Sequence, residues 1–210
     1  STAVLCTGGR TEKAAMALRP GLPEVCFVEV GDFTGAALRR VAEHHVPEVV
    51  FVGMAGKLAK LAGGVLMTHY TRSRVPHALL SEITVAAGGG ADLAARVEAA
   101  NTARHAAELW DEAGLLGAAA TELCSRVAEV LARFLADAAT KASEGAGPAA
   151  PGDGPAGPAA PMTSIQVIMV DFAGRAQIGA SPEVPAPPAP SVPPGAPPAA
   201  GAPPAPGAPA

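Results

Sequence analysis

The sequence predicts an α/β fold, in which a mostly parallel β-sheet with flanking helices is followed by a disordered tail rich in proline and alanine. Three short apolar runs near the N-terminus each lead through a glycine-containing turn into an amphipathic segment. Such strand–turn–helix repeats are typical of parallel sheets. The runs are continuously apolar, as expected of strands that are buried on both faces. All but four of the 22 prolines follow residue 147, so the two parts of the chain are different kinds of polymer.

The three strand–turn–helix units occupy about the first 70 residues. In the first unit, the run TAVLC leads through a Gly8–Gly9 turn into a helix that we expect to start near Thr11. The second unit predicts a strand over Val25–Val30 and a helix over Gly35–His45, and the third predicts a strand over Val49–Val52 followed by another helix. This order of elements predicts a Rossmann-like sheet.

The rest of the chain divides by composition. Residues 75–141 have apolar side chains at helical spacing, whereas residues 142–161 are rich in glycine, alanine and proline and predict a solvated loop. The run IQVIMV predicts a strand over 165–170 that pairs at an edge of the sheet. We therefore expect an α/β core over 1–141, a loop over 142–161, a closing strand of the same domain over 162–181 and a disordered Pro/Ala-rich tail over 182–210.

The composition disfavours nucleic acid and membrane partners. The net charge is -4 and only 3% of residues are aromatic, so the chain has neither a basic field nor many rings for base stacking. Lys57 and Lys60 interrupt the longest apolar stretch below membrane-spanning length. Three widely spaced cysteines favour a reduced, cytoplasmic protein. The chain starts in a strand, without Met or a signal peptide, so we expect that an upstream part is missing.

The candidate site lies where the predicted strands end, because ligands of open parallel sheets bind beyond the carboxyl ends of the strands. Polar groups and glycines follow each strand: Gly8, Gly9 and Arg10 after the first, Gly31 and Asp32 after the second, and Gly53, Gly56 and Lys57 after the third. Glycines let a ligand approach the backbone, and helix N-termini supply N–H donors. Any one loop could be an ordinary tight turn, but three together favour a site.

A cluster of cations follows the third strand. Lys57 and Lys60 lie three apart on one face of the predicted helix, where they are either merely solvated or directed at a ligand. His69, Arg72 and Arg74 follow closely. Such a cluster in an acidic chain suits a ligand with several carboxylates, which arginine binds bidentately. His69 fits a proton acceptor, a hydrogen-bond donor or a packed structural group.

Residue spacing excludes several common sites. A phosphate-binding P-loop has four residues between its glycines and a Ser or Thr after its lysine. GMAGK has only two residues between its glycines, and Leu58 follows its lysine. TGGRTE is not a GxGxxG fingerprint, and no GxSxG motif of a serine hydrolase occurs. The histidines lack partners at metal-ligand spacing, so we predict no metal site.

Several motifs together resemble one family. TGGRTEKA, VGDFTGAAL, VVFVGMAGKLAKLAGGVLMTHYTRS and EAANTARHAAEL occur in this order. In order and spacing they resemble the C-terminal half of the cobalt-precorrin-5B C(1)-methyltransferases of cobalamin biosynthesis. The resemblance covers roughly residues 2–135, GMAGKLAKLAGGVLMTH is its most distinctive part, and IQVIMVDFAGRAQIG is similar to the family's closing strand.

The resemblance implies that S-adenosylmethionine donates a methyl group to C1 of cobalt-precorrin-5B, giving cobalt-precorrin-6A. Cobalt would arrive as part of this small-molecule tetrapyrrole substrate, whose acetate and propionate arms fit the cation cluster. Lys57, Lys60, Arg72 and Arg10 are candidates to hold these arms. The full set of candidate binding residues is Gly8, Gly9, Arg10, Gly31, Asp32, Gly53, Gly56, Lys57, Lys60, Thr68, Arg72 and Ser73, and the candidate catalytic residue is His69.

Two other functions stay open at this stage. One is a non-catalytic α/β module that binds a polycarboxylate or corrinoid ligand, and the other is an interaction protein that uses its proline-rich tail. The family's N-terminal half, which opens with a Thr/Gly-rich segment, is absent here. If that half contributes to the active site, this chain would fold and yet be inactive. The sequence leaves the donor-binding loop and the oligomeric state open.

Overall fold

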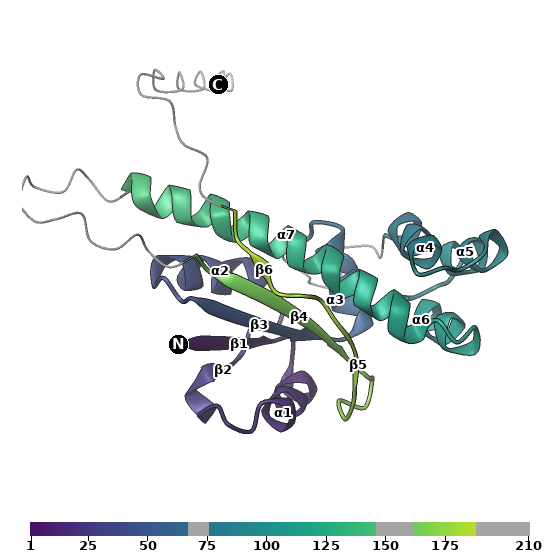
Figure 1. Ribbon diagram of the computed structural model, residues 1–210, viewed down its shortest axis with the longest axis horizontal. Helices are drawn as coiled ribbons and strands as arrows, with labels where there is room; N and C mark the ends of the chain where they lie inside the picture. The colour runs from purple at the N-terminus through teal and green to yellow at the C-terminus, as the bar shows by residue number, and fades with distance from the viewer. Residues whose placement is uncertain (67–75, 146–161, 188–210) are drawn as a thin grey trace, which may run out of the picture.

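The computed structural model describes residues 1–66, 76–145 and 162–187, whose strands form one six-stranded, mostly parallel sheet (Figure 1). The strand order is β2-β1-β3-β4-β5, and β6 also pairs with β4. The first four strands are parallel to one another, whereas β5 and β6 run antiparallel to β4. The strands are β1 (Thr2–Cys6), β2 (Phe27–Glu29), β3 (Glu48–Gly53), β4 (Ser164–Val170), β5 (Gln177–Ala180) and β6 (Val184–Pro185).

The described helices cover both faces of the sheet unequally (Figure 1). α1 packs on one face, while α2, α3 and α7 pack on the other. α4, α5 and α6 lie beyond the sheet, where α4 and α6 pack against α7 and α5 packs against α4 and α6. The helices are α1 (Gly9–Leu18), α2 (Thr34–Glu43), α3 (Ala55–Ala62), α4 (His77–Ala86), α5 (Ala91–Glu98), α6 (Ala103–Glu112) and α7 (Leu116–Gly145). The predicted α/β fold is therefore confirmed.

The central strands are buried on both faces, as their continuous apolar runs predict. Four successive residues of β3, Val49 to Val52, are at most 1% exposed. Val49 and Phe51 pack into the core under α2, α3 and α7, whereas Val50 and Val52 pack under α1. Helices on both sides thus hold β3 in the middle of the domain and direct its carboxyl end toward one edge of the sheet.

The helical region beside the sheet has its own buried centre. Trp110 of α6 is fully buried, and its Nε1–H donates a hydrogen bond of 2.8 Å to Oγ1 of Thr84 on α4. The Thr84 hydroxyl in turn donates to the carbonyl oxygen of Leu80 at 2.8 Å. The one polar atom of the indole ring is therefore satisfied inside an otherwise apolar cluster, as buried tryptophan requires.

Several predicted boundaries differ from the structure. The strand expected over Val25–Val30 is shorter, because a 3₁₀ turn over Glu24–Cys26 follows Pro23 and leaves Val25 85% exposed. The closing strand pairs at the β3 edge of the three earlier strands, as predicted, but β5 and β6 then cover its other side.

The predicted ends of the core and of the closing segment also differ. α7 continues to Gly145, past the expected boundary at 141. The segment from 182 begins with an ordered pairing rather than a tail, because Val184–Pro185 forms β6 against β4. None of the described helices is long and apolar enough to cross a membrane.

Candidate functional site

A pocket opens at the carboxyl edge of the sheet, between the loops that follow β1 and β3. These two strands are neighbours, but the chain leaves β1 toward β2 on one side and leaves β3 toward β4 on the other. In doubly wound sheets, ligands bind at this reversal of direction. The pocket has a volume of about 330 Å³. It is lined by Thr7, Gly8, Gly9, Arg10, Thr11, Met54 and Lys57.

Lys57 ties the loops after three strands together. Its Nζ atom donates to the carbonyl oxygen of Thr7 after β1 at 2.6 Å and to that of Gly31 after β2 at 3.1 Å. The same atom lies 3.3 Å from Oδ1 of Asp32. An ammonium group has three N–H donors, so these three acceptors satisfy it completely. Lys57 is not merely solvated: its charge fixes the relative positions of the loops.

The conformation of the second loop brings its carbonyl group to Lys57. Gly31 has a φ of 54°, in the left-handed region that glycine adopts without strain. The side chains of Lys57 and Asp32 are 33% and 30% exposed, so water still reaches the ion pair. The tie is therefore polar and partly hydrated, so it contributes little to stability.

The first loop closes on itself before α1 begins. The Thr11 hydroxyl accepts a hydrogen bond from the Gly8 N–H at 3.0 Å and donates one to the Gly8 carbonyl at 2.7 Å. A Cβ on Gly8 would have no neighbour within 4 Å, so the backbone here faces open space. Thr11, which is 2% exposed, thus holds a bare stretch of backbone against the pocket.

Arg10 joins the first loop to the loop between β4 and β5. Its Nη1 donates to the carbonyl oxygen of Phe172 at 2.9 Å, although the two residues are 162 positions apart. Gly174 packs on the Arg10 backbone so closely that a Cβ there would lie 2.7 Å from the Arg10 carbonyl oxygen. This loop of residues 171–176 was not among the predicted site residues. The glycine that follows the closing strand, as one follows each earlier strand, was the available signal.

The loop between β4 and β5 is stabilised from within. Oδ1 of Asp171 accepts hydrogen bonds from the backbone N–H groups of Arg175 at 2.6 Å and Ala176 at 3.3 Å. The N–H of Arg175 makes the largest contribution to a pKa of Asp171 below its ordinary value. The Phe172 ring lies under the guanidinium of Arg104 of α6, 5.0 Å from the ring centroid. The loop between β4 and β5 thus contacts both Arg10 of α1 and Arg104 of α6.

Acidic groups lie on the β2 side of the same edge. Burial, with smaller contributions from the negative charges of Glu12 and Glu29, raises the pKa of the Cys6 thiol to about 12. The Cys124 thiol on α7 also has a pKa of about 12 because of burial. Neither thiol is a nucleophile at neutral pH. The groups of the pocket therefore act through charge and hydrogen bonding rather than through cysteine chemistry.

The structure brings some predicted residues together and leaves others apart. Gly8, Gly9, Arg10 and Lys57 line the pocket, and Gly31 and Asp32 join it through Lys57, whereas Gly56 and Lys60 of α3 do not line it. Gly53 is buried, and a Cβ there would lie 2.8 Å from Leu58, so it serves the packing of α3 rather than the approach of a ligand. Thr68, His69, Arg72, Ser73 and Arg74 lie outside the described residues.

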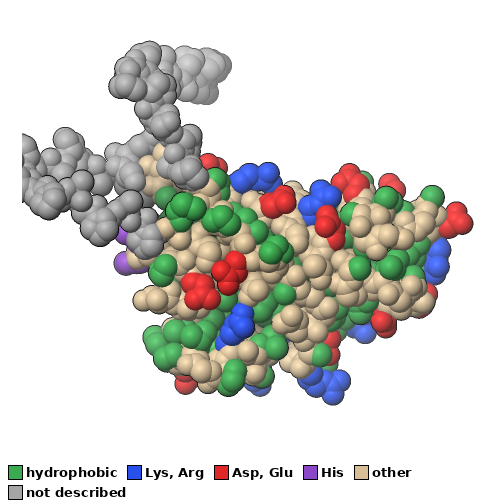
Figure 2. Space-filling model, viewed as in Figure 1, with side chains coloured by type: hydrophobic (Ala, Val, Ile, Leu, Met, Phe, Trp, Pro, Cys, Tyr) green, Lys and Arg blue, Asp and Glu red, His purple; other side chains and the backbone are tan. Residues whose placement is uncertain are grey.

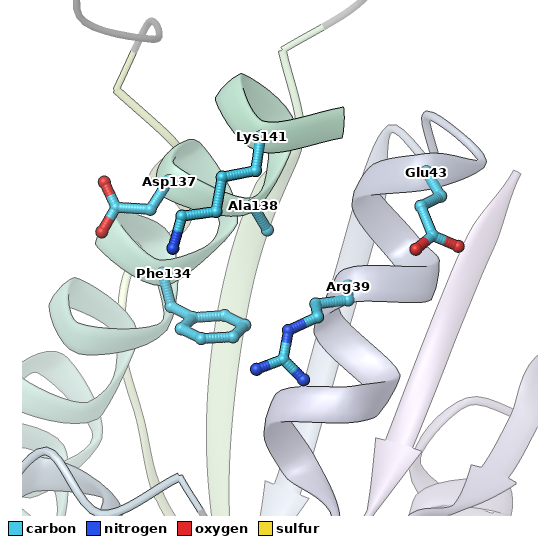
Figure 3. Close-up of a pocket in the computed structure, with 6 residues that line it drawn as sticks. All are labelled: Arg39, Glu43, Phe134, Asp137, Ala138 and Lys141. Carbon is cyan, nitrogen blue, oxygen red and sulfur yellow. The ribbon is translucent and has the colours of Figure 1, made fainter. Parts of the chain in front are cut away.

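A second pocket lies between α2 and α7 and has a volume of about 260 Å³ (Figure 3). Arg39 and Phe134 point toward each other across it, with the guanidinium carbon 5.5 Å from the ring centroid. Glu43, Asp137 and Lys141 also line it. It contains both signs of charge and none of the predicted site residues, and it lies in the helical layer rather than at the strand ends. The carboxyl-edge pocket is therefore the better candidate.

One face of the molecule carries charges of both signs rather than of one sign. On the face shown in Figure 2, Lys and Arg side chains are interspersed with Asp and Glu side chains. Within the described ranges, no group of three or more His, Cys, Asp or Glu side chains could hold a metal ion. Together, the fold and the carboxyl-edge pocket define a doubly wound α/β domain with a pocket between its strand-end loops.

Comparisons with known proteins show what the chain is similar to. Residues 67–143 match the family model described as the C-terminal domain of CbiD. The chain is 58% identical over 180 residues to the cobalt-precorrin-5B C(1)-methyltransferase of Salinispora tropica, covering 86% of this chain and 41% of that protein. It is 54% identical over 181 residues to the protein of the same name from Rubrobacter xylanophilus, covering 86% and 40%. The chain is thus a homologue of the cobalt-precorrin-5B C(1)-methyltransferases, and the predicted resemblance is confirmed.

The extent of the match limits what it says about the whole protein. The chain spans about two fifths of the length of these relatives. No solved structure matches it. The geometry of the pocket is therefore the structural basis for any statement about the reaction of this chain.

Proposed function

We propose that this chain is part of an enzyme that transfers a methyl group from S-adenosylmethionine to C1 of cobalt-precorrin-5B, giving cobalt-precorrin-6A in corrin-ring biosynthesis. The observation that carries the proposal is the carboxyl-edge pocket, where Lys57 and Arg10 tie four strand-end loops together. The identity of 58% to a methyltransferase named for this substrate supports it.

The size of the pocket fits a site in which the donor and the substrate occupy different places. At about 330 Å³ it is at the small end of ligand pockets, which span roughly 300–1,000 Å³. The donor therefore fits inside it, whereas the tetrapyrrole lies across its mouth. Arg10 is exposed, so its guanidinium can bind a carboxylate arm of the ring bidentately. Lys57 holds the loops in place and is a second cation near those arms.

The residues of the site act mainly by positioning. A methyl sulfonium is already activated for transfer, so the protein must above all align the donor with the ring carbon. Lys57 fixes the loops after β1, β2 and β3 relative to one another, and Arg10 adds the loop after β4. His69 remains a prediction as a group that takes or holds a proton, and Thr68, Arg72 and Ser73 remain predicted contacts. Cobalt belongs to the substrate in this proposal.

The direct test is methyl transfer. The chain, together with any sequence encoded upstream in the same frame, is incubated without oxygen with S-adenosylmethionine and cobalt-precorrin-5B. We expect the tetrapyrrole to gain the mass of one methyl group. The absence of a gain, with substrate that a known enzyme of this activity converts, would overturn the proposal.

A non-catalytic corrinoid-binding or polycarboxylate-binding module is the second candidate, because the chain spans only about two fifths of its relatives. It predicts that the chain binds the tetrapyrrole without turnover, even after the upstream sequence is restored. A reading frame with a Thr/Gly-rich upstream domain, beside other corrin-pathway genes, favours the enzyme instead. The two candidates therefore differ in turnover and not in binding.

A further inference from the structure

Charges of both signs lie around the carboxyl-edge pocket. Arg10 joins the Phe172 carbonyl after β4, and Lys57 joins the Thr7 and Gly31 carbonyls after β1 and β2. Glu29, the last residue of β2, and Glu12, in the first turn of α1, are close enough to act on the Cys6 thiol. A ligand in the pocket therefore meets the cations that line it and has these carboxylates nearby.

Glu29 is placed to contact a ligand. Its Oε2 atom lies 3.6 Å from where a Cβ on Gly9 would be, and Gly9 lines the pocket. The side chain is exposed, and it makes no hydrogen bond or ion pair with another residue in the described part of the chain. Both carboxylate oxygens are therefore available to accept hydrogen bonds at the border of the pocket.

The position of Glu29 in the topology matches that of a ribose-binding acidic residue. In doubly wound sheets that bind nucleotides, an acidic residue about 20 positions after the glycine turn accepts hydrogen bonds from ribose hydroxyls. Glu29 ends the second strand, 20 positions after Gly9. The glycine fingerprint itself is absent, but the strand order, the turn and the acid occupy the same relative places.

Charge separates the two ligands of the proposed reaction. A corrin precursor carries many carboxylates, which Glu29 and Glu12 repel, so its arms belong on the side of Lys57 and Arg10. The ribose of an adenosyl ligand is neutral and offers two neighbouring O–H donors, which suit the two oxygens of one carboxylate. The Glu29 carboxylate beside Gly9 thus suits the donor and disfavours the substrate.

We propose that Glu29 accepts hydrogen bonds from the ribose hydroxyls of the adenosyl ligand, which places the methyl donor on the β1–β2 side of the pocket. This inference rests on the proposed function. It names the donor-binding loop and a residue outside the predicted site. Lys57 and Arg10 are left to face the tetrapyrrole across the pocket.

The test is isothermal titration of the 210-residue chain with S-adenosylhomocysteine and with its analogue that lacks the ribose 2′-hydroxyl. We expect Glu29→Ala to weaken binding of S-adenosylhomocysteine roughly tenfold or more, as hydrogen bonds to a charged group imply. Removing the hydroxyl should weaken binding to the unsubstituted chain to a similar degree and should change little in the variant. Glu12→Ala is the matched control, because it removes the same charge on the same side without the proposed contact.

The outcomes separate this inference from the proposed function. Equal affinity of the Glu29→Ala and unsubstituted chains, or a penalty for the deoxy analogue that persists in the variant, overturns the role of Glu29. If methyl transfer occurs all the same, the proposed function stands. If the unsubstituted chain binds neither ligand and transfers no methyl group, both fail. Thermal melting of each variant shows that a loss of affinity is not a loss of folding.

Discussion

Two regions of this molecule are held together by different forces. The helical region around Trp110 of α6 is buried and apolar, with a single internal hydrogen-bond chain to Thr84 and Leu80. The carboxyl edge is held by Lys57 and Arg10, which bridge backbone carbonyls at partly exposed positions. Apolar burial contributes most of a domain's stability, whereas hydrated polar ties contribute little. Substitutions in the first region should therefore change stability, and those in the second should change the site.

The largest effect is expected in the helical region. Trp110→Ala removes a fully buried indole, and we expect it to lower the free energy of unfolding by about 3–5 kcal/mol. Thr84→Val keeps the shape but leaves the indole N–H without its acceptor, at a cost of about 1–3 kcal/mol. Urea unfolding followed by circular dichroism measures both. A change below about 1 kcal/mol for Trp110→Ala would show that this region is not a stabilising core.

Gly174 tests how closely the carboxyl edge is packed. Gly174→Ala forces a side chain onto a residue with a φ of 67° and puts its Cβ 2.7 Å from the Arg10 carbonyl oxygen. Gly114→Ala is the matched control, because Gly114 has a φ of 70° but no neighbour within 4 Å of a Cβ.

Both glycine variants are measured by urea unfolding and by ligand titration. We expect Gly114→Ala to cost about 1 kcal/mol of stability from backbone strain alone, and Gly174→Ala to cost about 3 kcal/mol. Only Gly174→Ala should also weaken ligand binding, since it moves the loop that Arg10 joins. Equal effects of the two substitutions would show that Gly174 is not tightly packed against the Arg10 backbone.

Substitution of Lys57 should give the sharpest contrast between an effect on stability and an effect on ligand binding. Lys57→Met removes the ammonium that joins the loops after β1, β2 and β3. Water can replace a partly exposed group, so we expect a loss of stability of only about 1 kcal/mol. Affinity for the tetrapyrrole should fall at least tenfold, because the loops lose their fixed positions and the site loses a positive charge. Lys13→Met, an exposed charge on α1, is the control.

Titration of the tetrapyrrole against both lysine variants and their unfolding curves provide the measurements. Unchanged affinity for Lys57→Met would show that this side chain does not contribute to tetrapyrrole binding. The predicted double substitution Lys57→Ala with Lys60→Ala should likewise weaken tetrapyrrole binding without unfolding the domain. Any loss of tetrapyrrole affinity in the double variant beyond the loss in Lys57→Met measures the contribution of Lys60 to binding. Lys60 does not line the pocket.

The sequence predicts the sheet better than it predicts the site. Continuous apolar runs such as that of β3 identify strands because burial on both faces leaves a local pattern. The order of glycines and cations likewise placed Gly8, Gly9, Arg10 and Lys57 at one edge. Two of the three acceptors of Lys57 are backbone carbonyls, which no residue pattern marks. The loop that holds Phe172 and Gly174 is remote in sequence from Arg10, so only the folded chain brings them together.

The smallest expected effect is on the pKa of a thiol, and it is found by comparing Cys6 at the carboxyl edge with Cys124 in α7. Burial raises the pKa of both Cys6, at the carboxyl edge, and Cys124, in α7, to about 12, but the charges of Glu12 and Glu29 contribute only to Cys6. The unfolded thiols ionise near pH 9.0, so the stabilisation from keeping them protonated is lost as the pH rises from about 9 toward 12. Glu29→Ala should therefore lower the pKa of Cys6 and speed its alkylation by iodoacetamide above pH 9, while Cys124 is unchanged. Mass spectrometry of the alkylated chain reports each cysteine separately. If both thiols respond alike, the charge of Glu29 acts on the whole domain rather than on the carboxyl edge, and the contrast between the two regions is lost.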